Sequence, residues 1–267
     1  MGPVIGGLGL RLLLISDAHG NPYALRAVLE AERYDEVLFL GDAVDYGPRP
    51  AEVIGVLRSA GARMVMGNHD NAVAFGVDCM CGEETHWVSV FFRANYTVKL
   101  ASPEQVAHLR SLPERVTLDL GPMGRALAVH GSPSSPLYGY LYPWLDDESL
   151  RKALRRSARL SAEPEGGDLA YDVYVVGHTH YQFARRVYGR LLVNPGSVGQ
   201  PRDGDPRASY AVIDTEREGV ELRRVKYDAE RVVKEIEALG VPEPYLGALR
   251  VMFLEGVTSR RPPGVQG

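Results

Sequence analysis

The chain has 267 residues, of which 45% are hydrophobic, and its formal net charge at pH 7 is −4. This length fits one large α/β domain or two small ones, and the charge excludes a basic surface that would make nucleic acid an obligatory partner. Residues 1–10 lack the basic start of a signal peptide, and no apolar run is long enough to cross a bilayer. We therefore expect a cytoplasmic protein without a membrane partner.

The first seventy residues alternate between strand and helix patterns. Continuous apolar runs at 12–15, 36–40 and 63–66 predict buried strands, and the segments 22–33 and 50–59 predict helices. This βαβαβ order is typical of a parallel sheet with right-handed crossovers. Each run is followed by polar residues, namely Asp17-Ala18-His19, Gly41-Asp42-Ala43-Val44-Asp45 and Gly67-Asn68-His69-Asp70.

The second half of the chain adds more strands that end in histidine. One predicted strand ends at His130, and another is followed by His178 and His180. The loop at 132–144 is long for a compact domain, and such loops are often functional lids. The other segments predicted as helices or strands are 83–101, 102–112, 116–120, 126–130, 146–160, 171–176, 183–187, 190–193, 209–214, 220–225, 229–239 and 242–250.

The ends of the chain and its cysteines carry no catalytic pattern. We expect a single domain at 10–258 between flexible termini at 1–9 and 259–267. The two cysteines, Cys79 and Cys81, are too few for a disulfide framework. A Cys-x-Cys pair could bind a metal, but two reduced thiols in or near a helix are favoured, and the role of the pair is left open.

Asp17 and His19 are separated by one residue at the end of the first strand. In an extended backbone, residues i and i+2 point to the same side, so this carboxylate and imidazole can aim at one point. Ligands bind beyond the carboxyl ends of the strands in open α/β sheets. The pair could serve as metal ligands or as an acid–base pair, although the same motif is common in ordinary turns.

Five predicted strand ends together offer two carboxylates, one amide and four or five imidazoles. Such a set suits two metal ions that share one bridging carboxylate. Mixed nitrogen and oxygen ligands favour Mn²⁺, Fe²⁺, Ni²⁺, Co²⁺ or Zn²⁺ and argue against Ca²⁺, which prefers oxygen alone. His86 and His108 lie on predicted helices without a polar cluster and are interpreted as structural or solvated. The strand-end residues are Asp17, His19, Asp42, Asn68, His69, His130, His178 and His180.

Taken together and in order, these motifs resemble those of the calcineurin-like metallophosphoesterases. They are Asp17-x-His19, Gly41-Asp42-x-x-Asp45, Gly67-Asn68-His69-Asp70, His130-Gly131 and Gly177-His178-x-His180. The resemblance spans about 12–225 and is greatest to the small bacterial and archaeal phosphodiesterase branch. It implies an α/β fold of two packed mixed β-sheets flanked by helices, a four-layer sandwich with the site at the strand ends.

The resemblance also assigns roles to single residues. One metal would take Asp17, His19, Asp42 and His180, and the second would take Asp42, Asn68, His130 and His178, with Asp42 as the bridge. A hydroxide activated by the two ions, with Mn²⁺ as the favoured metal, would attack phosphorus without a covalent enzyme intermediate. His69 would protonate the leaving oxygen, and Asp45 would orient His69.

One position departs from part of the family. The protein serine/threonine phosphatases carry a phosphate-gripping arginine where this chain has Tyr46, which argues against a phosphoprotein substrate. Arg202 could replace that arginine, and Tyr46 and Arg202 are the predicted substrate-binding residues, although a loop arginine can equally face solvent. We predict a phosphodiesterase acting on a small phosphate ester. A phosphomonoesterase, a dinucleoside polyphosphate hydrolase and an inert binding scaffold remain alternatives, and the oligomeric state is open.

Overall fold

The apolar residues of β1 (Arg11–Ile15) are all buried, because both faces of this strand are covered. Leu12 and Leu14 point into the space between two β-sheets, whereas Leu13 and Ile15 pack against helices. A continuous apolar run is what a strand in this position requires. The computed structural model describes residues 9–155 and 169–258. Apart from residue 9, the predicted flexible termini lie outside the described residues.

The first sheet is mixed, with the strand order β10-β9-β1-β2-β3. Strands β1, β2 (Glu36–Phe39) and β3 (Arg63–Met64) are parallel, as the βαβαβ pattern predicts, and β9 (Ala208–Asp214) and β10 (Gly219–Val225) run antiparallel. Four helices contribute apolar side chains to the core on the outer face of this sheet. They are α1 (Pro22–Ala31), α2 (Pro50–Ser59), α3 (Asn68–Phe75) and α6 (Pro103–Ser111).

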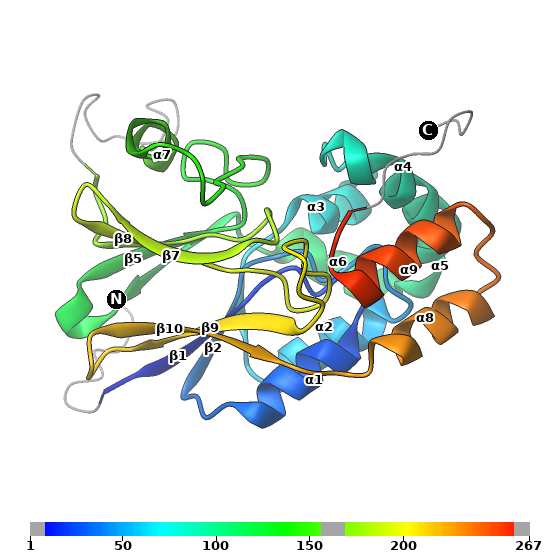
Figure 1. Cartoon of the computed structure of the whole chain (residues 1–267), viewed down its shortest axis with the longest axis horizontal. Helices are drawn as coiled ribbons and strands as arrows, with labels where there is room; N and C mark the ends of the chain where they lie inside the picture. The colour runs from blue at the N-terminus through cyan, green and yellow to red at the C-terminus, as the bar shows by residue number, and fades with distance from the viewer. Residues whose placement is uncertain (1–8, 156–168, 259–267) are drawn as a thin grey trace.

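The second sheet has the order β4-β5-β6-β8-β7 and packs face to face with the first (Figure 1). Its three inner strands are parallel, and its two edge strands are antiparallel. Helix α7 (Asp147–Leu154) covers its outer face. The order helix, sheet, sheet, helix confirms the predicted four-layer sandwich. The strands are β4 (Arg115–Asp119), β5 (Arg125–Val129), β6 (Val173–Val175), β7 (Gln182–Val187) and β8 (Arg190–Pro195).

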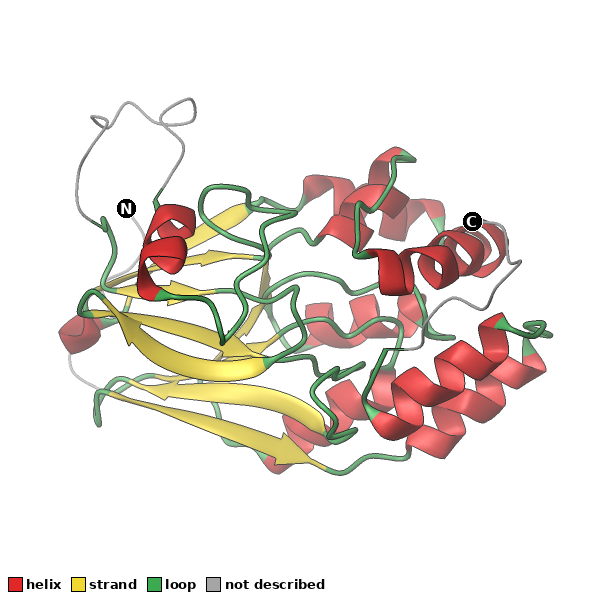
Figure 2. Ribbon diagram, turned by 45° about the horizontal axis from the view of Figure 1, so that its top comes forward, coloured by secondary structure: helices red, strands yellow, loops and turns green. Residues whose placement is uncertain are grey.

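The remaining helices gather beyond one end of the strands, as Figure 2 shows. Helices α4, α8 and α9 share one apolar core that also contains Tyr46. A π-helical turn and the short helix α5 follow α4, and a 3₁₀ turn joins β4 to β5. The bounds are α4 (Glu83–Phe92), the π-helix (Arg93–Thr97), α5 (Val98–Leu100), the 3₁₀ turn (Gly121–Met123), α8 (Ala229–Ala238) and α9 (Tyr245–Glu255).

Helix α3 (Asn68–Phe75) was not predicted from the sequence, and two predicted helices have different boundaries. The helix expected at 146–160 ends at Leu154, because Arg155 adopts an extended backbone, and residues 156–168 lie outside the described residues. The last helix begins at Tyr245 rather than near 242 and continues to Glu255. Neither difference touches the strand ends. Among the helices that the structure describes, none combines the length and the hydropathy needed to cross a membrane.

The packing between the sheets predicts a large cost for truncating Leu14, whose side chain is fully buried there. Leu14→Ala should lower the free energy of unfolding by about 2–5 kcal/mol, since it removes buried methyl groups and leaves a cavity. Leu222→Ala is the matched control, because Leu222 is 40% exposed on β10 and should cost less than about 1 kcal/mol. Urea unfolding measures both, and equal effects would contradict this packing.

Candidate metal centre

The loops that follow the strands have an unusual backbone. Non-glycine residues rarely adopt a positive φ, which costs roughly 1–2 kcal/mol each, yet seven predicted site residues do so here. The backbone around Asp17 and His19 was expected to be extended, and this expectation was wrong. The seven are Asp17 (φ 55°), His19 (44°), Asp42 (63°), Asp45 (69°), Tyr46 (60°), His178 (67°) and His180 (62°).

Hydrogen bonds between neighbouring loops hold this backbone. The amide of Asp17 donates to the carbonyl of Gly41 (2.9 Å), and the amide of His19 donates to the carbonyl of Asp42 (3.0 Å). The loops approach so closely that a Cβ at Gly67 would collide with the Asp42 carboxylate. These contacts between loops hold the backbone at Asp17 and His19 in its left-handed conformation. The Asp-x-His motif alone could therefore not predict that conformation.

The buried carboxylate of Asp70 also stabilises these loops. Its carboxylate accepts hydrogen bonds from the amides of Asp42 (2.7 Å), Ala43 (2.9 Å) and Gly67 (3.1 Å). It belongs to the Gly67-Asn68-His69-Asp70 motif, but the sequence reasoning gave it no role. An acidic residue three positions after a helix N-cap is the pattern that could have revealed it.

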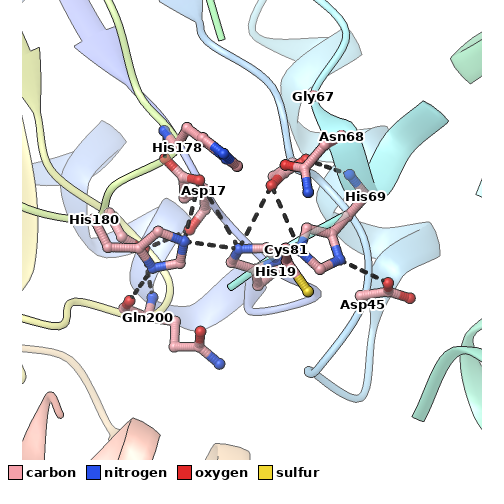
Figure 3. Close-up of polar contacts among 12 residues, drawn as sticks. Asp17, His19, Asp45, Gly67, Asn68, His69, Cys81, His178, His180 and Gln200 are labelled. Carbon is pink, nitrogen blue, oxygen red and sulfur yellow. Dashed lines mark hydrogen bonds and ion pairs between the residues drawn. The ribbon is translucent and has the colours of Figure 1, made fainter. Parts of the chain in front are cut away.

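Asp17, His19 and His180 form the first group of possible metal ligands (Figure 3). The Nδ1 atom of His19 faces the carbonyl of Val44 (2.9 Å), and that of His180 faces the carbonyl of Gln200 (2.5 Å). A carbonyl only accepts, so each Nδ1 must donate, and in a neutral ring Nε2 is left with a bare lone pair. Burial lowers the pKa of both histidines, which keeps them neutral. Nevertheless, the two Nε2 atoms lie 3.2 Å apart.

Asp42, His130 and His178 form the second group, and Asn68 joins it. The Nε2 atom of His130 lies 2.9 Å from Asn68 Oδ1, 3.1 Å from His178 Nδ1 and 3.2 Å from Asp42 Oδ2. The side-chain amide of Asn68 donates to the carbonyl of Cys79 (2.7 Å), which turns its oxygen toward the centre. The structure therefore gathers all seven predicted metal ligands into two adjoining groups.

Asp42 lies between the two groups. Its Oδ2 atom is 3.2 Å from His130 Nε2 and 3.9 Å from His19 Nε2. Asp42 Oδ2 and Asp17 Oδ1 are buried, and neither accepts a hydrogen bond of acceptable geometry within the described residues. Buried acceptors without donors are costly, so the centre requires positive charge. Burial alone would lower the pKa of His130, but the Asp42 carboxylate outweighs it and raises the pKa to about 9. The donor set therefore fits divalent cations with nitrogen and oxygen ligands.

His69 lies beside these two groups and not in either of them. Its Nδ1 atom is 2.8 Å from Asp45 Oδ2 and 3.2 Å from Ser89 Oγ, while its Nε2 atom is 4.0 Å from Asp42 Oδ2. The guanidinium of Arg93 donates to the same Asp45 oxygen (2.8 Å). Burial lowers the pKa of His69, but the negative charges of Asp42, Cys79 and Asp45 reverse this and raise it to about 9. The sequence reasoning missed Arg93, whose isolated charge within an aromatic run was the available signal.

Arg202 and Tyr46, the predicted substrate-binding residues, lie together at the centre. The guanidinium of Arg202 is 5.9 Å from the Tyr46 ring centroid and donates to the side-chain oxygen of Gln200 (2.9 Å). Its Nε atom is buried and has no partner within the described residues. Tyr46 is fully buried, with its ring edge-on to His19, so it acts on a substrate only through the residues it supports.

The two cysteines and the two remaining histidines were also considered in the sequence analysis. Cys79 and Cys81 are free thiols between α3 and α4, with sulfur atoms 2.9 Å apart, and together with His69 they form a third group of possible metal ligands. His86 does have a polar neighbour, contrary to expectation, since its Nε2 lies 2.9 Å from the exposed carboxylate of Asp78. His108 is half-buried on α6.

The comparisons with known proteins agree with this geometry. Residues 10–218 match the family model of the calcineurin-like phosphoesterase superfamily domain. The chain belongs to this superfamily. Membership places it among the metallophosphoesterases, which are hydrolases of phosphoric esters and use divalent metals. It is 30% identical to an uncharacterised protein of Methanocaldococcus jannaschii over 251 residues, covering 87% of this chain and 94% of that relative.

Solved metallophosphoesterase structures share the fold. The structure of a metallophosphoesterase from Sphaerobacter thermophilus is 31% identical, covers 94% of this chain and 100% of its own, and has a TM-score of 0.71. That of a hypothetical protein from Pyrococcus horikoshii is 22% identical, covers 90% of this chain and 97% of its own, and has a TM-score of 0.73. The latter similarity concerns the fold alone.

The position of Asp42 between the two groups predicts how metal binding responds to substitution. Asp42→Asn should weaken Mn²⁺ binding at both sites by about tenfold or more, whereas Asn68→Ala should weaken one site alone. Isothermal titration of metal-free protein with Mn²⁺ measures this. Asp119→Asn, which alters an exposed carboxylate on β4, is the control and should bind like wild type. Two unweakened sites in Asp42→Asn would contradict a bridging role.

Proposed function

We propose that this metallophosphoesterase is a phosphodiesterase that works with two divalent ions, with Mn²⁺ as the favoured metal. The observation that carries the proposal is the pair of neutral imidazole lone pairs, on His19 and His180, that face each other at 3.2 Å beside Asp17. Two acceptors at this distance repel each other unless a cation lies between them. In the second group, His130 Nε2 lies 3.1 Å from His178 Nδ1 and 3.2 Å from Asp42 Oδ2, and Asp42 would serve both ions.

Bound at these two groups, a pair of divalent ions would supply Lewis-acid stabilisation of the phosphoryl oxygens and lower the pKa of the attacking water. The chain's own residues would hold the ions in place. Asp17, His19 and His180 would hold one, and the second group with Asn68 would hold the other. Because Asp42 would be shared, its backbone, braced by Asp70, would set the position of both ions.

His69 would act as the general acid. Its Nδ1 faces Asp45, which Arg93 holds in turn, so Nε2 is the nitrogen that points toward the reacting group. Burial lowers the pKa of His69, but the Asp45 carboxylate raises it and so favours the protonated ring. The protonated Nε2 would donate its proton to the leaving oxygen, and Asp45 would stabilise the charged ring before transfer.

Arg202 would bind the phosphoryl group. Its buried, unpartnered Nε points to an anion as the missing partner. A phosphodiester carries one negative charge and a monoester carries up to two. Tyr46 stands in place of a second arginine, so Arg202 alone would face the phosphoryl group. One arginine matches the single negative charge of a diester better than the two charges of a monoester. This balance favours a phosphodiester over a monoester, and a dinucleoside polyphosphate is a further outcome to be tested.

Metal removal and a matched substrate panel test this proposal. Chelation should abolish hydrolysis of bis(4-nitrophenyl) phosphate, and Mn²⁺ should restore it. The value of kcat/KM should be higher on this diester than on 4-nitrophenyl phosphate, because both share a leaving group and differ in charge. Diadenosine tetraphosphate completes the panel. A higher value on the monoester or on the tetraphosphate would replace the diesterase proposal, and no hydrolysis with any ion would indicate a binding scaffold.

The acid role of His69 predicts a dependence on the leaving group. His69→Ala should keep its metals and lose little kcat/KM on nitrophenyl esters, because nitrophenolate leaves without a proton. On alkyl esters it should lose about 10²–10⁴-fold, and Asp45→Asn should show the same trend more weakly. The measurement is kcat/KM across esters of rising leaving-group pKa, with metal content determined for each variant. Equal losses on all esters would assign His69 to phosphoryl binding instead, and loss of metal would make it a ligand.

A further inference from the structure

The loop before α7 presents a row of stacked aromatic rings. Leu141 is buried in the core beneath the second sheet, whereas Tyr140 and Tyr142 are half-buried and Trp144 is exposed. Tyr140 and Tyr142 stack with an interplanar angle of 13°, and Tyr142 and Trp144 stack at 11° with centroids 4.7 Å apart. Tyr181 stands edge-on to Tyr142 and Trp144. We call these four residues the aromatic ladder.

The ladder is joined to the candidate metal centre at two points. The ring of Tyr140 lies 4.1 Å from the ring of His178, centroid to centroid. Tyr181 directly follows His180 in the chain. The ladder therefore begins at the metal ligands and runs outward to Trp144, which is 62% exposed.

The ladder is held in place before any ligand arrives. The guanidinium of Arg185, on β7, donates to the carbonyls of Pro143 (3.1 Å) and Leu145 (3.0 Å), on either side of Trp144. It also pairs with Asp147 at the start of α7 (2.5 Å). A fixed aromatic surface loses little conformational entropy when it binds a planar group.

Arg202 acts electrostatically on the inner rungs. Burial raises the pKa of Tyr140 and Tyr142, and the positive charge of the Arg202 guanidinium partly offsets this. The same guanidinium reaches the centre, where it lies 5.9 Å from the centroid of the Tyr46 ring. A single ligand can therefore meet an anion-binding group and the exposed end of the ladder at Trp144 together.

We propose that the aromatic ladder binds the base of a nucleotide ester while its phosphoryl group lies at the metal centre and Arg202. This inference rests on the proposed function and names its substrate class. The inner rungs cover one another's faces, so a nucleobase would extend the stack at the exposed ring of Trp144. Base–aromatic stacking tolerates any base. Three tyrosine hydroxyls and one indole N–H at the edges of the rings suit a polar aromatic group better than an aliphatic chain.

Tryptophan fluorescence tests base binding without requiring hydrolysis. Of the two tryptophans in the chain, Trp144 is exposed and Trp87 is 2% exposed. When AMP is mixed with the metal-loaded protein, it should quench the emission of Trp144, whereas ribose 5-phosphate should not. Trp144→Phe should lose the quenched component. Equal responses to AMP and ribose 5-phosphate would overturn the proposal, and quenching by phenyl phosphate as strong as that by AMP would replace the base with a phenolic ester.

Matched esters test whether the ladder selects substrates. The 4-nitrophenyl ester of thymidine 5′-phosphate and ethyl 4-nitrophenyl phosphate share a leaving group and differ in the base. The ratio of their kcat/KM values should favour the nucleotide and should fall about 5- to 100-fold in Tyr142→Ala and Trp144→Ala. Tyr142→Phe, which keeps the ring, should restore the ratio. Tyr188→Ala alters an exposed tyrosine at the β7–β8 turn and should leave the ratio unchanged.

The two tests separate this inference from the function on which it rests. If monoesters are cleaved and both diesters are not, the diesterase proposal fails, and the fluorescence test still decides whether the ladder binds a base. If both diesters are cleaved with a ratio that Trp144→Ala and Tyr142→Ala leave unchanged, the ladder proposal fails and the diesterase proposal stands.

Discussion

Backbone carbonyls decide the chemistry of this centre. The carbonyls of Val44, Gln200 and Leu40 each face the Nδ1 atom of a site histidine and so direct the Nε2 atom of that ring inward. Such a hydrogen bond fixes both the tautomer and the orientation of a ligating imidazole. The inward nitrogens meet the oxygens of two buried carboxylates, of which Asp17 Oδ1 and Asp42 Oδ2 accept no hydrogen bond within the described residues. Every role discussed above depends on the positive charge that these oxygens require.

The candidate metal centre also depends on the packing of the two sheets against each other. The first sheet leads into Asp17 and Asp42, and the second leads into His130 and His178. Hydrogen bonds join the loops of the two sheets directly, since the amide of His178 donates to the Asp17 carboxylate (3.1 Å) and Nδ1 of His130 donates to the Leu40 carbonyl (2.7 Å). Neither sheet alone forms a complete ligand group, so the centre can form only when the two sheets pack together.

The sequence was informative wherever a local pattern had one structural meaning. Apolar runs that stop at Asp, Asn or His predicted the strands and the residues at their ends, and the structure brings those residues together. The left-handed backbone at Asp17 and His19 could not be predicted in this way, because the hydrogen bonds that hold it come from the loop after β2. Arg93 reaches Asp45 across 48 positions of sequence, and no periodic pattern records such a contact. The stacking of Tyr140 on His178 was hidden for the same reason.

The junction between the sheets has a consequence for the life of the protein in the cell. An ion held by ligands from both sheets binds the folded chain and finds no comparable site in the unfolded one. Free ion at a hundred times its dissociation constant then adds about 2.7 kcal/mol to the free energy of unfolding. The supply of the metal would thus govern how often the chain opens to proteases, and metal starvation would reduce the abundance of this protein as well as its turnover of substrate.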